Sequence, residues 1–249
     1  MPAAPLLNIL DGVDSTNNYA MAQVHAGLAT NGMAWFAHEQ TAGRGQRGKN
    51  WESEPGRNIA LSLVLEPKES KLGQPFYLSA AVALACQDFF SHYAGEETKI
   101  KWPNDLYWRD RKAGGILIEN VLQGNEWKYA VIGIGININQ VTFDPSLKNP
   151  VSLKQITGKD FDAQALAIEL YHLLMNQTTA FEPTSFKKTM IRYNQHLYGR
   201  NKKIKLKKSN TVFETVVKEV NEYGQLITID AIERCFEFGE VEWVSLVND

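Results

Sequence analysis

Short apolar runs and longer helical patterns alternate over the first two thirds of the chain. Apolar and partly β-branched runs predict strands at 33–40, 58–65, 98–108, 116–122 and 129–139. A helix-like run at 19–24 is followed by a stop signal at Gly27, helical patterns predict further helices at 76–93, 162–181 and 184–197, and 141–158 is predicted to be a loop. The helix at 76–93 is apolar nearly all round, so we expect it to be buried across one face of a sheet.

The pattern changes near residues 197–200. Beyond them, short alternating runs predict strands at 203–206, 211–220, 226–232, 235–238 and 241–247. A module of roughly fifty residues that contains only strands has the size of an SH3-like barrel. We therefore expect two domains, residues 1–198 and residues 199–249.

The composition is that of a soluble globular protein, because 44% of the 249 residues are hydrophobic and 22% are charged. The net charge of −2 gives no electrostatic footprint for a general nucleic-acid binder, which is usually basic. No run is long and apolar enough to cross a membrane, and residues 1–10 lack the pattern of a signal peptide. Cys86 and Cys235 lie in apolar surroundings, and we expect buried free thiols in a reducing, cytoplasmic location.

The segment from Thr41 to Trp51 is the most informative stretch of the chain. It holds three glycines, three cations and one tryptophan between two predicted strands. Glycines let a backbone approach a ligand, backbone N–H groups with Arg and Lys suit a phosphate, and Trp51 offers a flat face for a purine. The segment matches neither the P-loop nor the Rossmann fingerprint. Taken alone, it is equally well interpreted as an ordinary surface hairpin with solvated cations.

A second polar cluster is predicted in the middle of the chain. Pro103 cannot donate to a β-ladder, so the strand is expected to break there and to leave the polar residues that follow it unpaired. A hairpin that turns at 109–111 would bring Lys112 back towards Lys101 and Asp105. The alternative is a solvated hairpin with a surface ion pair, which contributes little to stability.

Two further sets of polar residues allow more than one interpretation. Ser15 or Asp14 is expected to cap the first helix, and capping alone would explain Ser15, Thr16 and Asn17 if no ligand site lay nearby. Asn137 lies in a strand interrupted by glycines, which often mark the close approach of a ligand or another backbone. Its carboxamide suits the edge of a base, but it is as typical of a strand end.

Five motifs, taken together, resemble those of the biotin protein ligases. They are Asp14-Ser15-Thr16-Asn17, Gln40 to Gly48 with Trp51, Lys101-Trp102-Pro103-Asn104-Asp105, Lys112 to Glu119, and Gly133 to Asn137. They follow the order of that family, and the predicted C-terminal module is similar to the family's small barrel. The resemblance implies an α/β (α+β) fold, in which a mixed-sheet catalytic domain carries a small C-terminal SH3-like β-barrel.

The resemblance also implies a two-step reaction. The biotin carboxylate attacks the α-phosphate of Mg-ATP, which gives biotinyl-5′-AMP and pyrophosphate. A lysine amine of a biotin carboxyl carrier protein then attacks this acyl-adenylate, and AMP leaves. Both steps build negative charge on phosphate oxygens, so cations and Mg²⁺ must face them. We expect the ATP phosphates to hold most of the Mg²⁺ coordination.

By this resemblance, individual residues acquire expected roles. The biotin-binding set is Ser15, Thr16, Asn17, Gln40, Arg44, Lys112, Gly114 and Gly115. The ATP-binding set is Gly43, Arg44, Gly45, Gln46, Arg47, Gly48, Trp51, Asn104, Lys112 and Asn137. The catalytic set is Arg44, Arg47, Lys101, Asp105 and Lys112, in which Asp105 is expected to receive the proton of the incoming amine.

Two features depart from the family's patterns. Gln46 stands where the Gly-rich motif often has arginine, which is expected to change how tightly the adenylate is retained rather than the reaction. Ser15 comes so early that we expect no DNA-binding helix-turn-helix domain before it, hence no operator binding and no nucleic-acid partner. A homodimer remains open, because an exposed sheet edge could pair with a second copy.

Three alternatives stay open. A lipoate or octanoate protein ligase shares the catalytic fold, but the Gly-Arg-Gly loop and the motif Lys101 to Asp105 favour biotin. A non-catalytic biotin-binding regulatory protein would keep the pocket, although the intact Arg44, Lys101 and Lys112 argue against it. The third is a protein-interaction module that acts through the β barrel alone.

Overall fold

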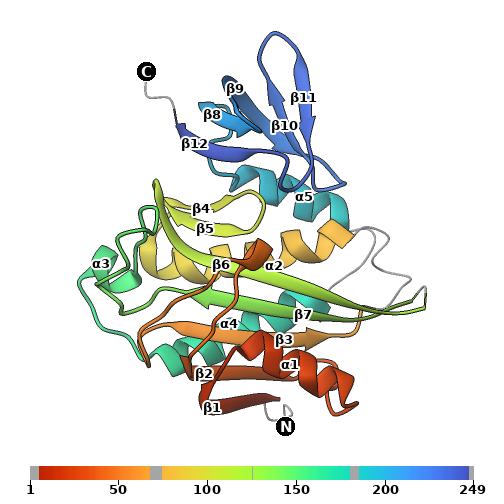
Figure 1. Cartoon of the computed structure of the whole chain (residues 1–249), viewed down its shortest axis with the longest axis vertical. Coiled ribbons are helices and arrows are strands. Elements are labelled where there is room, and N and C mark those ends of the chain that lie inside the picture. Colours follow the sequence, from red (N-terminus) through yellow and green to blue (C-terminus); the bar gives the residue numbers. More distant parts are fainter. Residues whose placement is uncertain (1–5, 68–74, 125, 180–184, 247–249) are drawn as a thin grey trace.

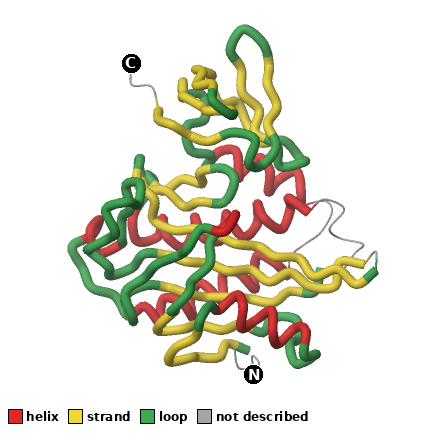
Figure 2. The backbone as a smooth tube through the Cα atoms, in the orientation of Figure 1, coloured by secondary structure: helices red, strands yellow, loops and turns green. Residues whose placement is uncertain are grey.

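The computed structural model describes residues 6–67, 75–124, 126–179 and 185–246, which form two β-sheets (Figure 1). The larger sheet has seven strands from the first part of the chain, and the smaller one has five strands at the C-terminal end. Figure 2 shows loops that cross the near face of the larger sheet. The predicted element ends at Phe181, Thr184 and Val247 lie outside the described residues.

The larger sheet has the strand order β1-β2-β3-β7-β6-β5-β4. Its strands are β1 (Leu7–Val13), β2 (Ala34–Gln40), β3 (Ile59–Leu65), β4 (Thr98–Lys101), β5 (Asp105–Trp108), β6 (Arg111–Gln123) and β7 (Glu126–Ile136). β1 and β2 are parallel and the other neighbours antiparallel, so the sheet is mixed, as the resemblance implies. The apolar pattern missed β1, because this edge strand is largely exposed and carries polar residues between its apolar ones.

The predicted strand 98–108 is in fact two strands, β4 and β5, joined in a hairpin. The chain reverses around the cis Trp102–Pro103 bond, so Lys101 and Asp105 become cross-strand partners. Proline lacks the N–H needed for a ladder, and the break that it predicts is here a full reversal. The second expected turn, between β5 and β6, is present and brings Lys112 opposite Tyr107.

Helices cover both faces of the larger sheet (Figure 1). They are α1 (Thr16–His25), α2 (Pro75–Ala94), α3 (Leu153–Thr157), α4 (Ala163–Thr179) and α5 (Phe186–Gln195). α2 packs against α4, α5 and the sheet, and its Leu78, Phe89 and Phe90 are almost fully buried in the main core, as its apolar pattern predicts. In the described part of the chain, no helix is both long enough and apolar enough to span a membrane.

α1 lies on the opposite face of the sheet, where Ala20 and Val24 form a second cluster with Trp35, Val64 and Val131. Ser15 occupies the predicted cap position, but its side chain makes no capping hydrogen bond.

Gln40, at the end of β2, supplies that bond instead, because its Oε1 accepts the Thr16 N–H at 2.8 Å. Sequence-local capping rules cannot find a partner that lies 24 positions away.

The segment 141–158, predicted to be a loop, contains the short helix α3. Ser152 and Gln155 form a capping box at its start, and Gly158 ends it in the left-handed conformation. Five residues are too few to show helical periodicity, so only the capping residues could have revealed this helix.

The C-terminal sheet is antiparallel in the order β11-β10-β9-β8-β12. Its strands are β8 (Lys203–Lys208), β9 (Thr211–Val220), β10 (Leu226–Ile229), β11 (Glu233–Phe236) and β12 (Glu242–Leu246). Its inner residues, such as Leu206 and Val217, belong to the same apolar cluster as Tyr193 of α5 and Trp102 of the β4–β5 turn. The small sheet is therefore packed firmly on the larger part of the molecule.

Of the two cysteines, both are free, but only Cys86 is buried as predicted. Cys235 is exposed, because Phe236 of β11 faces the core and the neighbouring side chain points the opposite way. An apolar neighbourhood in sequence does not reveal which face of an edge strand a residue occupies.

Candidate active site

Glycines form the floor of the candidate site. Gly115 of β6 and Gly135 of β7 are cross-strand partners, and Gly133 lies on the same face of β7. A β-carbon at Gly135 would come within 2.4 Å of the Trp51 ring, and one at Gly133 within 2.2 Å of Asn17 Oδ1. Only glycine permits this contact, since the ring and the carboxamide pack directly on the backbone.

The Gly-rich segment forms the roof. It turns through a 3₁₀ segment (Gln46–Gly48) and closes as a narrow hairpin, in which the Gly45 N–H donates to the Lys49 carbonyl and the Trp51 N–H to the Gly43 carbonyl, at 2.7 and 2.8 Å. A β-carbon at Gly43 would lie 2.2 Å from the Trp51 carbonyl oxygen, so the hairpin closes only with glycine there. The segment is thus a hairpin, as one interpretation of the sequence held, but this hairpin also covers a pocket.

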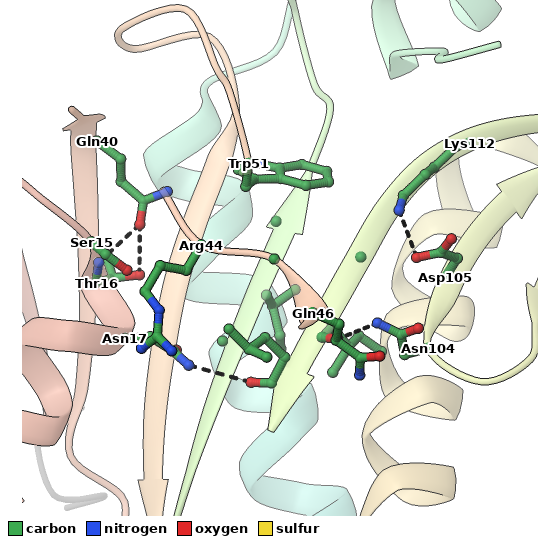
Figure 3. A pocket seen from close by; sticks show the side chains of 17 residues that line it. Ser15, Thr16, Asn17, Gln40, Arg44, Gln46, Trp51, Asn104, Asp105 and Lys112 are labelled. Atoms are coloured by element: carbon green, nitrogen blue, oxygen red, sulfur yellow. Dashed lines mark hydrogen bonds and ion pairs between the residues drawn. The ribbon is translucent and has the colours of Figure 1, made fainter. Parts of the chain in front are cut away.

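The pocket between floor and roof has two chemically different ends (Figure 3). Uncharged polar side chains of Ser15 and α1 gather with Gln40 at one end, with Arg44 beside Asn17, whereas Lys112 and Asp105 face each other at the other end. Trp51 lies between the two ends. The arrangement suits an elongated ligand with a neutral polar head and an anionic tail.

Hydrogen bonds fix the side chains of the neutral end. Gln40 Oε1 accepts both the backbone N–H and the hydroxyl of Thr16, at 2.8 and 3.1 Å. Ser62 of β3 donates to Asn17 Oδ1 at 2.7 Å. Ser15, Thr16 and Asn17 are buried, so this end presents fixed donors and acceptors.

The charged end is built from neighbouring strands β5 and β6. Lys112 Nζ lies 2.7 Å from Asp105 Oδ1, which confirms the closeness that the predicted hairpin implied. Asn104, the residue before β5, is fixed to β6 by two hydrogen bonds. Its Nδ2 donates to the Ile116 carbonyl at 2.7 Å, and its backbone carbonyl accepts the Ile116 N–H. Lys112 and Asp105 remain partly exposed, so an incoming group has access to both.

Arg44 joins the roof to the floor. Its guanidinium makes two hydrogen bonds to Glu119 of β6, at 2.8 and 3.0 Å, and a third to Asn18 Oδ1 at 2.8 Å. Glu119 also accepts a hydrogen bond from Asn17 Nδ2 at 3.0 Å. Both cations that line the pocket are therefore paired with carboxylates, Arg44 with Glu119 and Lys112 with Asp105.

Most residues predicted for the site line this pocket. They are Ser15, Thr16, Asn17 and Gln40 at the neutral end, Arg44, Gly45, Gln46 and Trp51 in the roof, and Asn104, Asp105, Lys112 and Gly115 around the charged end. Gly43 and Gly48 shape the roof, and Gly114 packs against the Gly135 carbonyl, where a β-carbon would come within 2.7 Å. These three glycines lie outside the lining, and so do Arg47, Lys101 and Asn137.

Arg47 points away from the pocket towards the C-terminal sheet. Its φ of 56° is left-handed, and its Nη1 donates to the Gly239 carbonyl at 3.2 Å. The guanidinium also lies 5.4 Å from the Phe238 ring centroid. Gly239 has to be glycine, because its φ is +85° and a β-carbon would meet the guanidinium. The roof is thus attached to the C-terminal sheet.

Lys101 lies in an aromatic cage between the β4–β5 hairpin and the C-terminal sheet. Its Nζ is 4.3 Å from the ring centroid of Tyr107, 5.6 Å from that of Tyr198 and 5.4 Å from that of Trp243. Burial of the charged amine lowers the pKa of Lys101 from 10.5 to about 8, although nearby Asp105 opposes the shift. Lys101 is therefore close to the charged end without lining it.

Asn137 follows β7 and is buried. Its Nδ2 donates to the carbonyls of Val151 and Lys112, at 3.1 and 3.4 Å, and its backbone N–H donates to the Ala113 carbonyl. In this structure the carboxamide therefore fixes the loop before α3 beside β6. This is the role of a strand-end residue, the alternative to contact with the edge of a base.

Sequence reasoning did not assign Gly133, Gly135, Ser62 or Glu119 to the site. The strand glycines were a usable signal, since they mark close approach. Ser62 is the one polar residue in the apolar strand β3, and Glu119 ends a resembling motif. Their pairing with Asn17 and Arg44 joins distant segments and is visible only in the fold.

A family model described as the biotin/lipoate A/B protein ligase family matches residues 10–137, which is just over half of the chain. The chain belongs to the biotin/lipoate A/B protein ligase family. The matched range runs from β1 to Asn137, so it contains the whole pocket lining, and the C-terminal sheet lies outside it.

Named relatives of this biotin/lipoate ligase family member are similar over much of its length. The bifunctional ligase/repressor BirA of Escherichia coli is 28% identical over 221 residues, which cover 88% of this chain and 68% of that protein. The biotin–[acetyl-CoA-carboxylase] ligase of Paracoccus denitrificans is 36% identical over 163 residues, which cover 63% and 66%. The chain thus spans about two thirds of the length of these two relatives.

Among solved structures, a biotin protein ligase from Aquifex aeolicus in complex with biotin and ATP superimposes with a TM-score of 0.80. The match covers 96% of this chain and 98% of that one at 24% identity. The whole fold, including the C-terminal sheet, is therefore that of these ligases, and the fold class expected from the sequence is confirmed.

Proposed function

We propose that the protein activates biotin with ATP to biotinyl-5′-AMP and transfers the biotin to a lysine of a biotin carboxyl carrier protein. The observation that carries this proposal is the pocket with a fixed neutral end, a charged end and an aromatic ring between them. The family and the names of its relatives support the same reaction.

The neutral end suits the ureido ring of biotin, which has two N–H donors and one carbonyl acceptor. Ser15, Thr16, Asn17 and Gln40 supply hydroxyl and carboxamide groups in a buried setting. Buried polar groups discriminate strongly between ligands that satisfy them and ligands that do not. Lipoate ends in an apolar dithiolane ring and octanoate in a methyl group, so neither would satisfy this end.

The charged end suits the reacting carboxylate and the α-phosphate. Attack of the carboxylate oxygen on phosphorus forms the acyl–phosphate bond and breaks the bond to pyrophosphate, so negative charge grows on phosphate oxygens. The Lys112 ammonium lies where it would face that charge. In the second step Asp105 would take the proton of the incoming lysine amine as the new amide bond forms and AMP leaves.

The nucleotide base would lie against Trp51. The indole N–H of Trp51 is buried and has no hydrogen-bond partner among the described residues, so an acceptor on the ligand would satisfy it. The roof hairpin would exclude water from the mixed anhydride, which hydrolyses readily.

Mg²⁺ would enter with ATP and neutralise phosphate charge. Among the described residues there is no group of three or more His, Cys, Asp or Glu side chains arranged to hold a metal ion. Asp105 is the one carboxylate among the described residues that line the pocket, which fits an ion coordinated mainly by phosphates and water.

The remaining parts of the proposal concern the protein's setting. We place it in the cytoplasm, without a nucleic-acid partner, and divide it at residues 198 and 199 into a catalytic and a C-terminal domain. The net charge of −2 and the free cysteines support this setting. The exposed edge strand β1 would allow a homodimer by strand pairing.

Exchange of labelled pyrophosphate into ATP tests the first step. With Mg²⁺ present, exchange should depend on biotin and should not appear with lipoate or octanoate. Lys112→Ala should lower it strongly, whereas Lys154→Ala, which removes an ion pair with Asp160 outside the pocket lining, should not. Exchange driven by lipoate would favour the lipoate ligase, and none with any acid would favour a regulatory binding protein.

A further inference from the structure

The Gly-rich roof and the floor of the pocket are joined by one charged pair, Arg44 of the roof and Glu119 of β6. We propose that Glu119 is a positioning residue that holds the roof closed over the ureido end of the bound intermediate. The identity of the ligand rests on the proposed function, whereas the closure of the roof by Glu119 does not.

The geometry of the pair is that of a strong contact. Two parallel hydrogen bonds, Arg44 Nη2 to Glu119 Oε1 at 2.8 Å and Nη1 to Oε2 at 3.0 Å, form a bidentate arrangement. Glu119 is the more buried partner, with 24% of its side chain exposed against 42% for Arg44.

Both partners are held in place by α1. Asn17 donates to Glu119 Oε2, and Asn18 Oδ1 accepts from Arg44 at 2.8 Å. Asn18 is itself oriented by Asp14, whose carboxylate accepts the Asn18 Nδ2 at 2.6 Å. This bond lowers the pKa of Asp14 below its ordinary value of 3.8. The Arg44–Glu119 pair therefore belongs to a hydrogen-bond network that joins the roof, the start of α1 and β6.

The position of Glu119 decides what the pair encloses. Gly115, Leu117 and Glu119 share the pocket face of β6, and Lys112 lies at the beginning of the same strand. The closed pair therefore walls off the neutral end, and access is left at the Lys112 end. A ligand whose ureido ring fills the neutral end could leave past the roof only after the Arg44–Glu119 pair opens.

Gln46 of the roof lines the pocket and brings no charge of its own. Arg44 is therefore the one cation of the roof among the described residues that line the pocket, and its guanidinium is paired with Glu119. If Glu119 instead competes with the ligand for Arg44, loss of the Glu119 charge should slow the release of the bound intermediate.

The first measurement is hydrogen exchange of the roof in the ligand-free protein. Glu119→Gln keeps the size of the side chain and an acceptor for Asn17 but removes the charge that binds Arg44. Amides of residues 43–51 should exchange about fivefold faster, in the range of a partly buried charged pair. The control is Glu233→Gln, which removes the exposed ion pair with Lys218 in the C-terminal sheet and should leave the roof unchanged.

The second measurement is release of preformed biotinyl-5′-AMP, followed by Trp fluorescence after dilution into unlabelled competitor. Release should be about fivefold faster in Glu119→Gln, and Glu119→Asp should recover part of the loss. Salt should accelerate release in the wild type and have little effect in Glu119→Gln, which a merely structural role would not produce.

Unchanged exchange of the roof in a folded Glu119→Gln protein would overturn the closure. Slower release in that variant would overturn the retention role and show that Glu119 competes with the ligand for Arg44. If the wild type forms no adenylate while the variant's roof exchanges faster, the proposed function fails and the closure by Glu119 stands.

Discussion

Individual glycines decide the shape of the pocket. Gly133, Gly135 and Gly43 each lie where a β-carbon would overlap another atom at 2.2 to 2.4 Å. Such contacts cannot be relieved by small rotamer changes, since they involve a backbone carbonyl, a ring and a buried carboxamide. The site is therefore sensitive to the smallest possible substitutions.

Gly135→Ala should displace the Trp51 ring and weaken nucleotide binding. Overpacking of this kind costs about 1–3 kcal/mol, so we expect ATP affinity to fall roughly tenfold or more. Gly12→Ala in β1 is the matched control, because its β-carbon would meet its nearest neighbour at an ordinary 3.9 Å. Titration of ATP by calorimetry measures both, and equal affinity in the two variants would contradict the role of Trp51.

Lys101 should titrate far below an ordinary lysine. The folded pKa, about 8, is lower than the unfolded value of 10.5, so its charged form destabilises the fold below pH 8. This destabilisation should fade as the pH rises from about 8 to 10.5, where both states lose the proton. Lys101→Met should therefore gain stability relative to wild type at pH 7 but less at pH 10.

Denaturant unfolding at the two pH values measures this difference, and ¹³Cε NMR of Lys101 gives the pKa directly. The aromatic cage, which favours the charged amine, acts against the shift. A midpoint near 10.5 would show that the cage outweighs desolvation.

At the scale of elements, the sequence predicted the helices and strands that follow a continuous apolar pattern. The strands β2, β3, β9 and the helix α2 agree closely with their apolar runs, because each buries a continuous face. The sequence missed β1, α3 and the β4–β5 reversal, whose structure depends on sheet edges and on capping rather than on periodicity. Among site residues it found most of the lining, but not the glycines of β7. It also did not find the pairing of Arg44 with Glu119 or the directions of the Arg47 and Asn137 side chains.

The contact between the roof and the C-terminal sheet predicts a role for Arg47 different from that of a phosphate ligand. Arg47→Ala would free the roof from the Gly239 carbonyl and should raise the KM for ATP about two- to fivefold, in line with a partly exposed hydrogen bond. Lys49→Ala, an exposed cation of the same loop, should change it little. A loss of more than a hundredfold in kcat with Arg47→Ala would instead indicate direct contact with the reacting phosphate.

On the scale of the whole molecule, the two sheets share one continuous core. Trp102 Nε1 donates to the Gly224 carbonyl at 2.8 Å, and Asn194 exchanges two hydrogen bonds with Val220 across the same interface. A site whose roof, hairpin and cage all contact the C-terminal sheet should not function without it. The proposed boundary at residues 198 and 199 would therefore separate the two sheets, but we expect the two parts to unfold together.

Thermal unfolding should consequently be a single cooperative transition. Trp102→Phe removes the hydrogen bond to the partly buried Gly224 carbonyl, which should lower the stability of the whole chain by about 1 kcal/mol. Differential scanning calorimetry would show one transition that shifts as a unit. Two separate transitions in the wild type would contradict a shared core.

The central claim is that this pocket attaches biotin to a protein. The most direct test is to incubate the full chain with biotin, Mg-ATP and a biotin carboxyl carrier domain, and to analyse the carrier by intact mass and peptide mapping. The account predicts one biotin on one lysine, dependent on ATP and abolished by Lys112→Ala. An unmodified carrier, with the protein folded and binding biotin, would contradict it.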